Sequence, residues 1–376
     1  MRTQIHALTS PAPGSSHRLC SLHYGDPKKG RKAYLQAALH ADEPPGLLVA
    51  YHLRRRLAEL ESGGKIQGEI VLVPMANPIG LGQRILGRGL GRFEQASGEN
   101  FNRHYAELSA AAWTRLAPTV DSGQTPSLAE VRAALREACA EVSAASELAS
   151  LRKTLLSLSI DADWVIDLHC DSEAIVHLYT ADPVWPQVEP LARLLGSRVN
   201  LLATESGGEP FDEACSMVWA RLNRLWQEQR QSEGPWPDAC VALTVELRGE
   251  ADVSHELAEA DAQALIDYLT HQGLIEGPSP VLPEPAIEPL PLAGSVPVKT
   301  PSGGVLVHRP LLGQSVRKGQ CVAEVINPLD GSAIELCAEN DGILYARETG
   351  RVVHAGMSVC KVAGSEAVRT GSLLSA

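Results

Sequence analysis

The sequence predicts an α/β domain followed by a small all-β domain. Strand-like apolar runs alternate with helical stretches up to about residue 275, which is typical of a sheet covered by helices on both faces. After a proline-rich stretch, short apolar runs are separated by glycines, as in an all-β module. We therefore divide the chain into an α/β domain (1–275), a linker (276–294) and a β domain (295–376).

Six strands and four helices are expected in the α/β domain. The strand-like runs lie at about 31–40, 69–75, 163–169, 174–180, 198–204 and 241–247. The helical stretches lie at 45–61, 186–196, 212–230 and 254–271. Residues 105–160 interrupt this alternation with a turn-rich stretch, Pro118 to Ser127, and an Ala/Leu/Glu-rich helix or helical hairpin. We interpret them as a helical insertion, used as a lid or as a contact in a homo-oligomer.

The linker and the β domain each have a distinctive amino-acid composition. Six prolines in the nineteen residues 276–294 predict a semi-rigid, extended linker. Within the β domain, Gly-x-x-Val-x-x-Gly-x-x-Val-Ala at 313–323 resembles the biotinyl/lipoyl carrier domains. Those domains modify a lysine at a hairpin tip, but the corresponding stretch, 327–337, contains no lysine. A structural or gating module is therefore expected.

Composition excludes several classes of function. The net charge is −12, from 33 basic and 45 acidic residues, and only 4% of the residues are aromatic, which argues against a nucleic-acid partner. No apolar run approaches the roughly 20 residues that span a bilayer, and no apolar signal segment follows Met1. The eight cysteines include no Cys-x-x-Cys pair, which predicts reduced thiols in a cytoplasmic protein without a membrane partner.

A histidine and a carboxylate three residues apart can bind one metal ion. This spacing occurs at His23/Asp26, His40/Glu43 and His104/Glu107. We interpret the first pair as part of a turn and the third as a solvated helix face. Only His40/Glu43 follows a buried-looking strand, 33–39, and precedes an amphipathic helix. In that helix Asp42 or a neighbour is a candidate N-cap, and Pro44 or Pro45 suits the first turn.

Two further strand-like runs end in residues of the same chemistry. The run that starts at Asp163 ends at His169, and the run that starts at Val241 ends at Glu246. Two histidines and one glutamate with an open fourth position form the ligand set of a catalytic zinc, and the lone carboxylate suits a general base. Asp167 is either an ordinary strand-end carboxylate or an acid that lines the site. Cys170 is interpreted as a small buried hydrophobe.

Five motifs, in this order, carry a resemblance to a known family: His40-x-x-Glu43, Asn77-Pro78, Asn100-Phe-Asn102-Arg103, Asp167-Leu-His169 and Val245-Glu246. The arrangement resembles the succinylglutamate desuccinylase/aspartoacylase family of carboxypeptidase A-like zinc hydrolases, over most of 30–250 and the β module. The resemblance implies a mixed eight-stranded sheet flanked by helices, with a barrel-sandwich-like β domain beside the active site. Asn-Phe-Asn-Arg replaces the aspartoacylase-like Asp-Leu-Asn-Arg, which favours the less defined deacylase branch.

The resemblance also implies roles for individual residues. His40, Glu43 and His169 would bind one Zn²⁺ per chain, and Glu246 would be the general base. Asn102 and Arg103 would hold a substrate carboxylate, the alternatives being a helix-capping asparagine and a surface arginine. The arginine that polarises the scissile carbonyl would be Arg84, Arg88 or Arg92, and we favour Arg92.

These residues predict a cytoplasmic zinc-dependent deacylase that hydrolyses the amide bond of an N-acyl amino acid or a similar small anionic substrate. A metallocarboxypeptidase acting on peptides and an esterase would use the same groups. The β domain favours the small substrate, because it would narrow the cleft. A non-catalytic ligand-binding protein is the alternative from another class, and the presence of every catalytic residue type argues against it.

Overall fold

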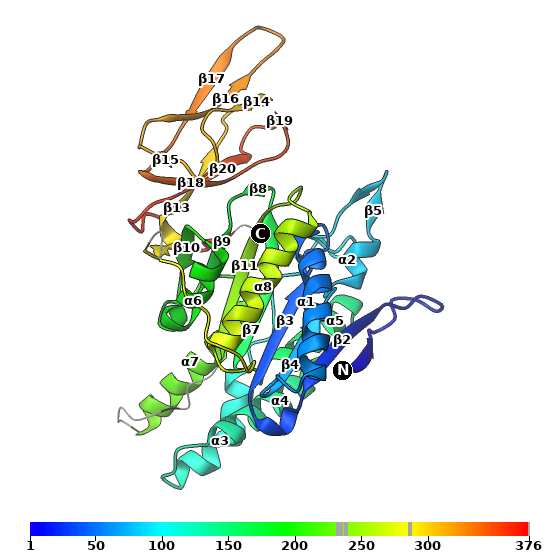
Figure 1. Ribbon diagram of the computed structural model, residues 1–376. Coiled ribbons are helices and arrows are strands. Elements are labelled where there is room, and N and C mark those ends of the chain that lie inside the picture. The colour runs from blue at the N-terminus through cyan, green and yellow to red at the C-terminus, as the bar shows by residue number, and fades with distance from the viewer. Residues whose placement is uncertain (231–235, 237–239, 285–287, 375–376) are drawn as a thin grey trace.

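A large mixed sheet forms the centre of the molecule (Figure 1). The computed structural model describes residues 1–230, 236, 240–284 and 288–374. Within these residues the sheet has nine strands, in the order β1-β2-β4-β3-β7-β11-β9-β10-β12. Their bounds are Arg2–Ala7 (β1), Arg18–Gly25 (β2), Lys32–Ala37 (β3), Glu69–Val73 (β4), Trp164–Asp171 (β7), His177–Thr180 (β9), Val199–Leu202 (β10), Val241–Gly249 (β11) and Leu290–Pro291 (β12).

Helices cover both faces of this sheet (Figure 1). One face packs against α1 (Pro45–Ser62), α6 (Trp185–Leu195) and α8 (His255–His271). The other packs against α3 (Ser109–Asp121), α4 (Leu128–Glu141), α5 (Glu147–Ser159) and α7 (Phe211–Arg230). The predicted α/β sandwich is thus confirmed, and so are its four predicted helices and the strands β3, β4, β7, β9, β10 and β11. Among the described helices, none is both long and apolar enough to cross a membrane.

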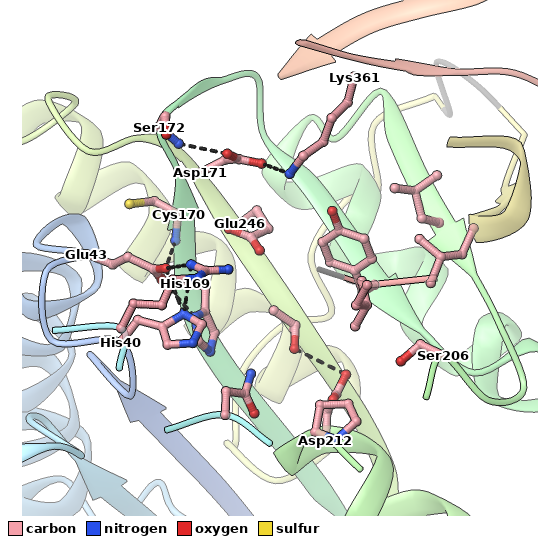
Figure 2. Close-up of a pocket in the computed structure, with 18 of the residues that line it drawn as sticks. His40, Glu43, His169, Cys170, Asp171, Ser172, Ser206, Asp212, Glu246 and Lys361 are labelled. Carbon is pink, nitrogen blue, oxygen red and sulfur yellow. Dashed lines mark hydrogen bonds and ion pairs between the residues drawn. The ribbon is translucent and has the colours of Figure 1, made fainter. Parts of the chain in front are cut away.

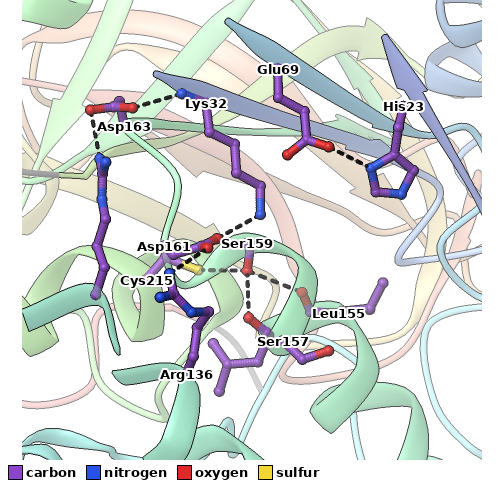
Figure 3. Close-up of polar contacts among 12 residues, drawn as sticks. His23, Lys32, Glu69, Arg136, Leu155, Ser157, Ser159, Asp161, Asp163 and Cys215 are labelled. Atoms are coloured by element: carbon purple, nitrogen blue, oxygen red, sulfur yellow. Dashed lines mark hydrogen bonds and ion pairs between the residues drawn. The ribbon is translucent and has the colours of Figure 1, made fainter. Parts of the chain in front are cut away.

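Three local predictions, for His23, His104 and Asp42, were wrong. His23 does not lie in a turn: it is buried in β2, with its Nδ1 3.0 Å from Glu69 Oε1 (Figure 3). His104 lies outside a helix, because α3 begins only at Ser109. Asp42 does not cap α1; its Oδ2 accepts the N–H of Gly91, and the N-cap position of α1 is Pro44, without a side-chain hydrogen bond.

The insertion 105–160 contains three helices, α3 to α5, instead of a single helix or hairpin, and Pro118 lies inside α3 instead of starting a turn. Ion pairs connect α4 with β3 through the segment that precedes β7 (Figure 3). Arg136 of α4 lies 3.1 Å from Asp161, which also pairs with Lys32 of β3 at 2.5 Å. None of the residues that the structure places around the main cavity comes from this insertion, so its position does not favour a lid.

The C-terminal part folds into two small antiparallel sheets, β13-β20-β18-β15 and β17-β16-β14-β19, around their own apolar core. Their bounds are Ser295–Lys299 (β13), Gly304–His308 (β14), Ser315–Val316 (β15), Cys321–Ile326 (β16), Ala333–Cys337 (β17), Gly342–Arg347 (β18), Val352–Val353 (β19) and Ser358–Ala363 (β20). The predicted all-β character is confirmed.

The β domain is joined to the α/β domain through the end of β7. The short strand β8 (Glu173–Ala174) pairs with β18, and Glu173 Oε2 lies 2.6 Å from Arg347 Nε. The end of the predicted linker does not run free between the two domains. Its strand β12 pairs with β10 and adds a ninth strand to the large sheet, where the resemblance implied eight. Residues 285–287 of that segment lie outside the described residues.

Candidate metal centre

His40, Glu43 and His169 meet at one edge of the sheet. His40 follows β3, Glu43 precedes α1, and His169 lies near the end of β7. Because β3 and β7 are parallel neighbours, their carboxyl ends bring these residues together. Glu43 Oε1 lies 2.8 Å from His40 Nδ1, and Glu43 Oε2 lies 2.7 Å from His169 Nδ1 (Figure 2). All three are buried, and their candidate ligand atoms lie within 4.8 Å of one another.

The outer nitrogen of each imidazole lies beside an oxygen of another side chain. His40 Nε2 lies 2.9 Å from Asn100 Oδ1, and His169 Nε2 lies 3.0 Å from Asp167 Oδ2. Each Nδ1 therefore points towards Glu43. Holding one ring nitrogen so that the other faces the ion is the usual arrangement around metal-bound histidines. Asp167 is fully buried; it lies behind His169 and is not among the residues that line the cavity.

The electrostatics of the cluster fit a cation. Burial alone would lower the pKa of His169, but the carboxylates of Asp167 and Glu43 outweigh it and raise that pKa well above its usual value. Burial likewise opposes ionisation of Glu43, yet His40 and His169 hold its pKa well below the usual range. The donor set, two imidazoles and one carboxylate backed by a second, is one that a divalent cation such as zinc accepts. The residues present thus fit a metal site.

Replacing Asp167 by asparagine is expected to weaken metal binding. The amide keeps the shape but removes the negative charge behind His169, and loss of such an outer partner typically costs about 10–100-fold in metal affinity. Competition with a chelator measures this directly. Asp267→Asn, on α8 away from the cluster, should leave the affinity unchanged; equal affinity in Asp167→Asn and wild type would show that Asp167 does not support the ligand.

Glu246 lies beside the cluster on the next strand. In the parallel ladder of β11 and β7 it is the register partner of His169, so the two side chains emerge on the same face of the sheet. Within the described part of the chain, Glu246 Oε2 is buried without a hydrogen-bond partner. Burial, and then the charge of Glu43, raise the pKa of Glu246 to about 8. Figure 2 shows its carboxyl between Glu43 and Lys361.

Of the three candidate arginines, Arg92 reaches the cluster. Its Nη1 lies 3.1 Å from Glu43 Oε1 and 3.3 Å from His40 Nδ1. Arg84 and Arg88 lie in an exposed hairpin, β5 (Arg84–Ile85) and β6 (Arg88–Gly89), and neither is among the residues lining the cavity. Gly91 makes the position of Arg92 possible, because a Cβ there would lie 2.2 Å from the backbone nitrogen of Asp42.

Asn102 and Arg103 line the same cavity as the cluster. Asn102 Oδ1 accepts the N–H of Phe211, the first residue of α7, so this asparagine does cap a helix. Arg103 is not a surface arginine: it is 8% exposed, and its Nη1 donates to the Asn102 carbonyl at 2.7 Å. Cys170 is a buried thiol, and its backbone N–H donates to Glu43 Oε2 at 3.1 Å.

The cavity around these residues has a volume of about 340 Å³ and is walled by both domains. The β domain contributes Arg347, Glu348, Lys361 and neighbours of Lys361 on β20. Lys361 Nζ pairs with Asp171 Oδ2 at 2.5 Å (Figure 2). No sequence pattern indicated Lys361, because only the docking of the two domains brings it to the site.

Comparisons with known proteins agree with this geometry. Residues 29–272 match the family model described as the succinylglutamate desuccinylase/aspartoacylase catalytic domain. The N-alpha-acetyl-L-2,4-diaminobutyric acid deacetylase of Halomonas elongata is 24% identical over 338 residues, which is 89% of this chain and 82% of that protein.

Solved structures share the fold over nearly the whole chain. A protein assigned to the same family from Shewanella amazonensis is 25% identical, with a TM-score of 0.84 over 96% of this chain and 98% of that chain. The product-bound ectoine utilization protein EutE (DoeB) of Ruegeria pomeroyi is 16% identical, with a TM-score of 0.65 over 96% and 95%. Since the family model covers well over half of the sequence, the chain belongs to the succinylglutamate desuccinylase/aspartoacylase family.

Proposed function

We propose that this protein is a zinc-dependent deacylase that hydrolyses the amide bond of a small N-acyl amino acid. The observation that carries the proposal is the buried His40–Glu43–His169 cluster beside Glu246 on the neighbouring strand, whose Oε2 has no hydrogen-bond partner in the described part of the chain. The deacetylase activity named for the Halomonas elongata relative supports an N-acyl amino acid as the substrate class. The cytoplasmic location expected from the thiol content is part of this proposal.

Zinc held by His40, Glu43 and His169 would supply a Lewis acid that acidifies water and polarises an acyl carbonyl. Glu246 then accepts the proton of the attacking water and returns it to the nitrogen of the departing amine. The guanidinium of Arg92 donates hydrogen bonds to the oxygen on which negative charge develops. Arg103 binds the substrate carboxylate through its planar fork of donors.

The dimensions of the cavity favour a small substrate over a polypeptide. A volume of about 340 Å³ lies at the lower end of the range of roughly 300–1,000 Å³ for small-molecule sites. Arg347, Glu348 and Lys361 of the β domain also line the cavity. An N-acyl amino acid fits such a space.

A substrate panel on the zinc-loaded protein tests the proposed reaction. The panel contains N-acetyl amino acids, dipeptides and tripeptides with a free C-terminus, and the acetyl esters of hydroxy acids. The proposal expects the highest kcat/KM for an N-acetyl amino acid. A higher kcat/KM for the peptides would overturn it in favour of a carboxypeptidase, and a higher value for the esters would overturn it in favour of an esterase.

Arg103→Ala is expected to weaken substrate binding by about 2–5 kcal/mol, because the substrate carboxylate would be left buried without its partner. The loss should appear mainly in KM. Converting the substrate carboxylate to a carboxamide should reproduce this loss in the wild-type protein, and the two changes together should cost little more than either alone. If the wild-type protein hydrolyses the acid and the carboxamide equally well, Arg103 is not a carboxylate clamp.

A further inference from the structure

One loop carries three of the groups that the proposed reaction uses. This loop, residues 92–103, begins at Arg92, which contacts the metal cluster. It ends at Asn102 and Arg103, the proposed carboxylate clamp, which line the cavity. Between its ends, Asn100 contacts the first histidine of the cluster. We call residues 92–103 the site loop, and its placement decides where these groups lie.

Asn100 fixes which nitrogen of His40 is free to bind a metal ion. Asn100 Oδ1 accepts the backbone N–H of Asn102 at 2.8 Å. A backbone N–H can only donate, so this contact identifies the oxygen of the amide. The same oxygen lies 2.9 Å from His40 Nε2, which must therefore carry the ring proton. In the neutral ring, Nδ1 keeps its lone pair on the side that faces Glu43.

Arg152 of α5 holds the site loop from outside the cavity. Its Nη2 donates to the carbonyl of Asn100 at 2.8 Å, and its Nη1 lies 2.7 Å from Glu99 Oε2. The side chain of Glu99 is 43% exposed, so this ion pair contributes little by itself. The Arg152 side chain, in contrast, is only 12% exposed, and Asn100 is buried. A charged donor on a buried carbonyl is one of the stronger kinds of hydrogen bond.

The helix that carries Arg152 is itself anchored in the core. Leu148, Leu151 and Leu155 of α5 are buried in the apolar cluster that also contains residues of β3, β4 and β7. No residue of the insertion 105–160 lines the cavity. The insertion therefore reaches the site through the loop that Arg152 holds, and not by closing over the cavity.

We propose that Arg152 is a positioning residue that holds the site loop for two tasks. It keeps Asn100 against His40, and it keeps the carboxylate clamp at the cavity wall. This inference rests on the proposed function and gives the helical insertion a part in it. Arg152 is neither a candidate metal ligand nor a residue that lines the cavity, so it acts through the main chain of the loop.

Hydrogen exchange tests this hold directly and needs neither metal nor substrate. Arg152→Met keeps an unbranched apolar stem and removes every donor. Mass spectrometry of the full chain should show the amides of the site loop exchanging about tenfold faster in this variant, the size expected when a hydrogen bond from a charged donor is lost. Peptides from β7 should exchange as in wild type. Arg136→Met removes a half-exposed arginine of α4 in the same insertion and should leave the site loop unchanged.

Zinc affinity tests the consequence for His40. Competition with a chelator should give Arg152→Met a zinc Kd about tenfold above that of wild type, the lower end of the effect of losing an outer partner, because Asn100 is still present but less firmly held. Arg136→Met and Glu99→Gln should keep the wild-type Kd.

Kinetics at saturating zinc test the consequence for the clamp. In Arg152→Met the KM for an N-acetyl amino acid should rise, because the clamp follows Asn100 in the chain. The KM for the corresponding carboxamide should stay unchanged, because that substrate has no carboxylate for the clamp to bind. A general loss of stability would not separate the two substrates.

Three results would overturn the proposal: unchanged exchange of the site loop in Arg152→Met, an unchanged zinc Kd in that variant, or equal changes in Arg136→Met. If Arg152→Met does not unfold cooperatively, Arg152→Lys decides the point. Its single ammonium on a shorter stem cannot hold the Asn100 carbonyl and Glu99 together, so wild-type exchange and a wild-type zinc Kd in Arg152→Lys would overturn the proposal.

The outcome is separable from that of the proposed reaction. Faster exchange and weaker zinc binding in Arg152→Met, found in a protein that hydrolyses peptides or esters best, would uphold the positioning role and overturn only the proposed reaction. Rapid hydrolysis of N-acetyl amino acids, with exchange and zinc binding that do not depend on Arg152, would do the reverse.

Discussion

Glu246→Gln is expected to abolish nearly all activity while the fold and the metal content stay unchanged. An amide cannot accept the proton of the attacking water, and the same group cannot then protonate the departing amine. One proton-transfer role typically contributes about 10²–10⁴-fold to the rate. The loss of both roles should therefore lower turnover by more than about 10²-fold. Glu246 is not one of the three candidate ligands, and its Oε2 has no partner among the described residues, so little else should change.

Glu250→Gln is the matched control for this variant. Glu250 also lines the cavity, and burial followed by the charges of Asp42 and Glu43 raises its pKa to about 7, but it has no assigned part in the reaction. Steady-state kinetics on zinc-replete samples should show near wild-type turnover for Glu250→Gln. Near wild-type turnover in Glu246→Gln, with a full complement of zinc, would remove Glu246 from the mechanism.

Glu43→Gln is expected to cause a loss of similar size for a different reason. Both carboxylate oxygens of Glu43 are used: Oε1 faces His40 and Arg92, and Oε2 faces His169 and the N–H of Cys170. An amide cannot replace the negative charge between two imidazoles and a guanidinium. Without the Lewis acid that this cluster would hold, activity should fall on the order of 10³-fold or more.

Metal removal and restoration distinguish this loss from simple unfolding. Chelation should inactivate the wild-type protein, and added zinc should restore its activity. Glu43→Gln should remain inactive at the same zinc concentration while its thermal unfolding stays cooperative. Wild-type protein that keeps its activity after exhaustive chelation, with no metal left by elemental analysis, would exclude a metal-dependent reaction.

The interior strands except β2 could be predicted from the sequence, and the edge strands β1 and β12 could not. β3, β4, β7 and β11 are near-continuous apolar runs because both faces of the sheet are covered. β1 is a mostly exposed, polar edge strand. The sequence of β2 does not alternate between apolar and polar residues. Its inward-facing residues include Ser21 and His23, which hydrogen-bond to each other at 2.9 Å. Polar residues satisfied by one another inside a sheet give no apolar signal.

The clustering of the candidate site was predictable for a related reason. His40, His169 and Glu246 each follow or end an apolar strand, and neighbouring parallel strands bring their ends to one edge. The partners of these residues depend on side-chain geometry that no spacing encodes. Asn100 contacts His40 across sixty positions of sequence, and Lys361 arrives only because β18 pairs with β8. The roles of Arg92, Asn102 and Arg103 stay predictions.

The zinc content of purified protein tests the central claim, that His40, Glu43 and His169 form one metal site, most directly. Elemental analysis by mass spectrometry should find one zinc ion per chain in wild type and in His271→Ala, which removes an exposed histidine at the end of α8. His40→Ala and His169→Ala should each contain almost none after the same dialysis. Equal zinc in His40→Ala and wild type would contradict the assignment of the site.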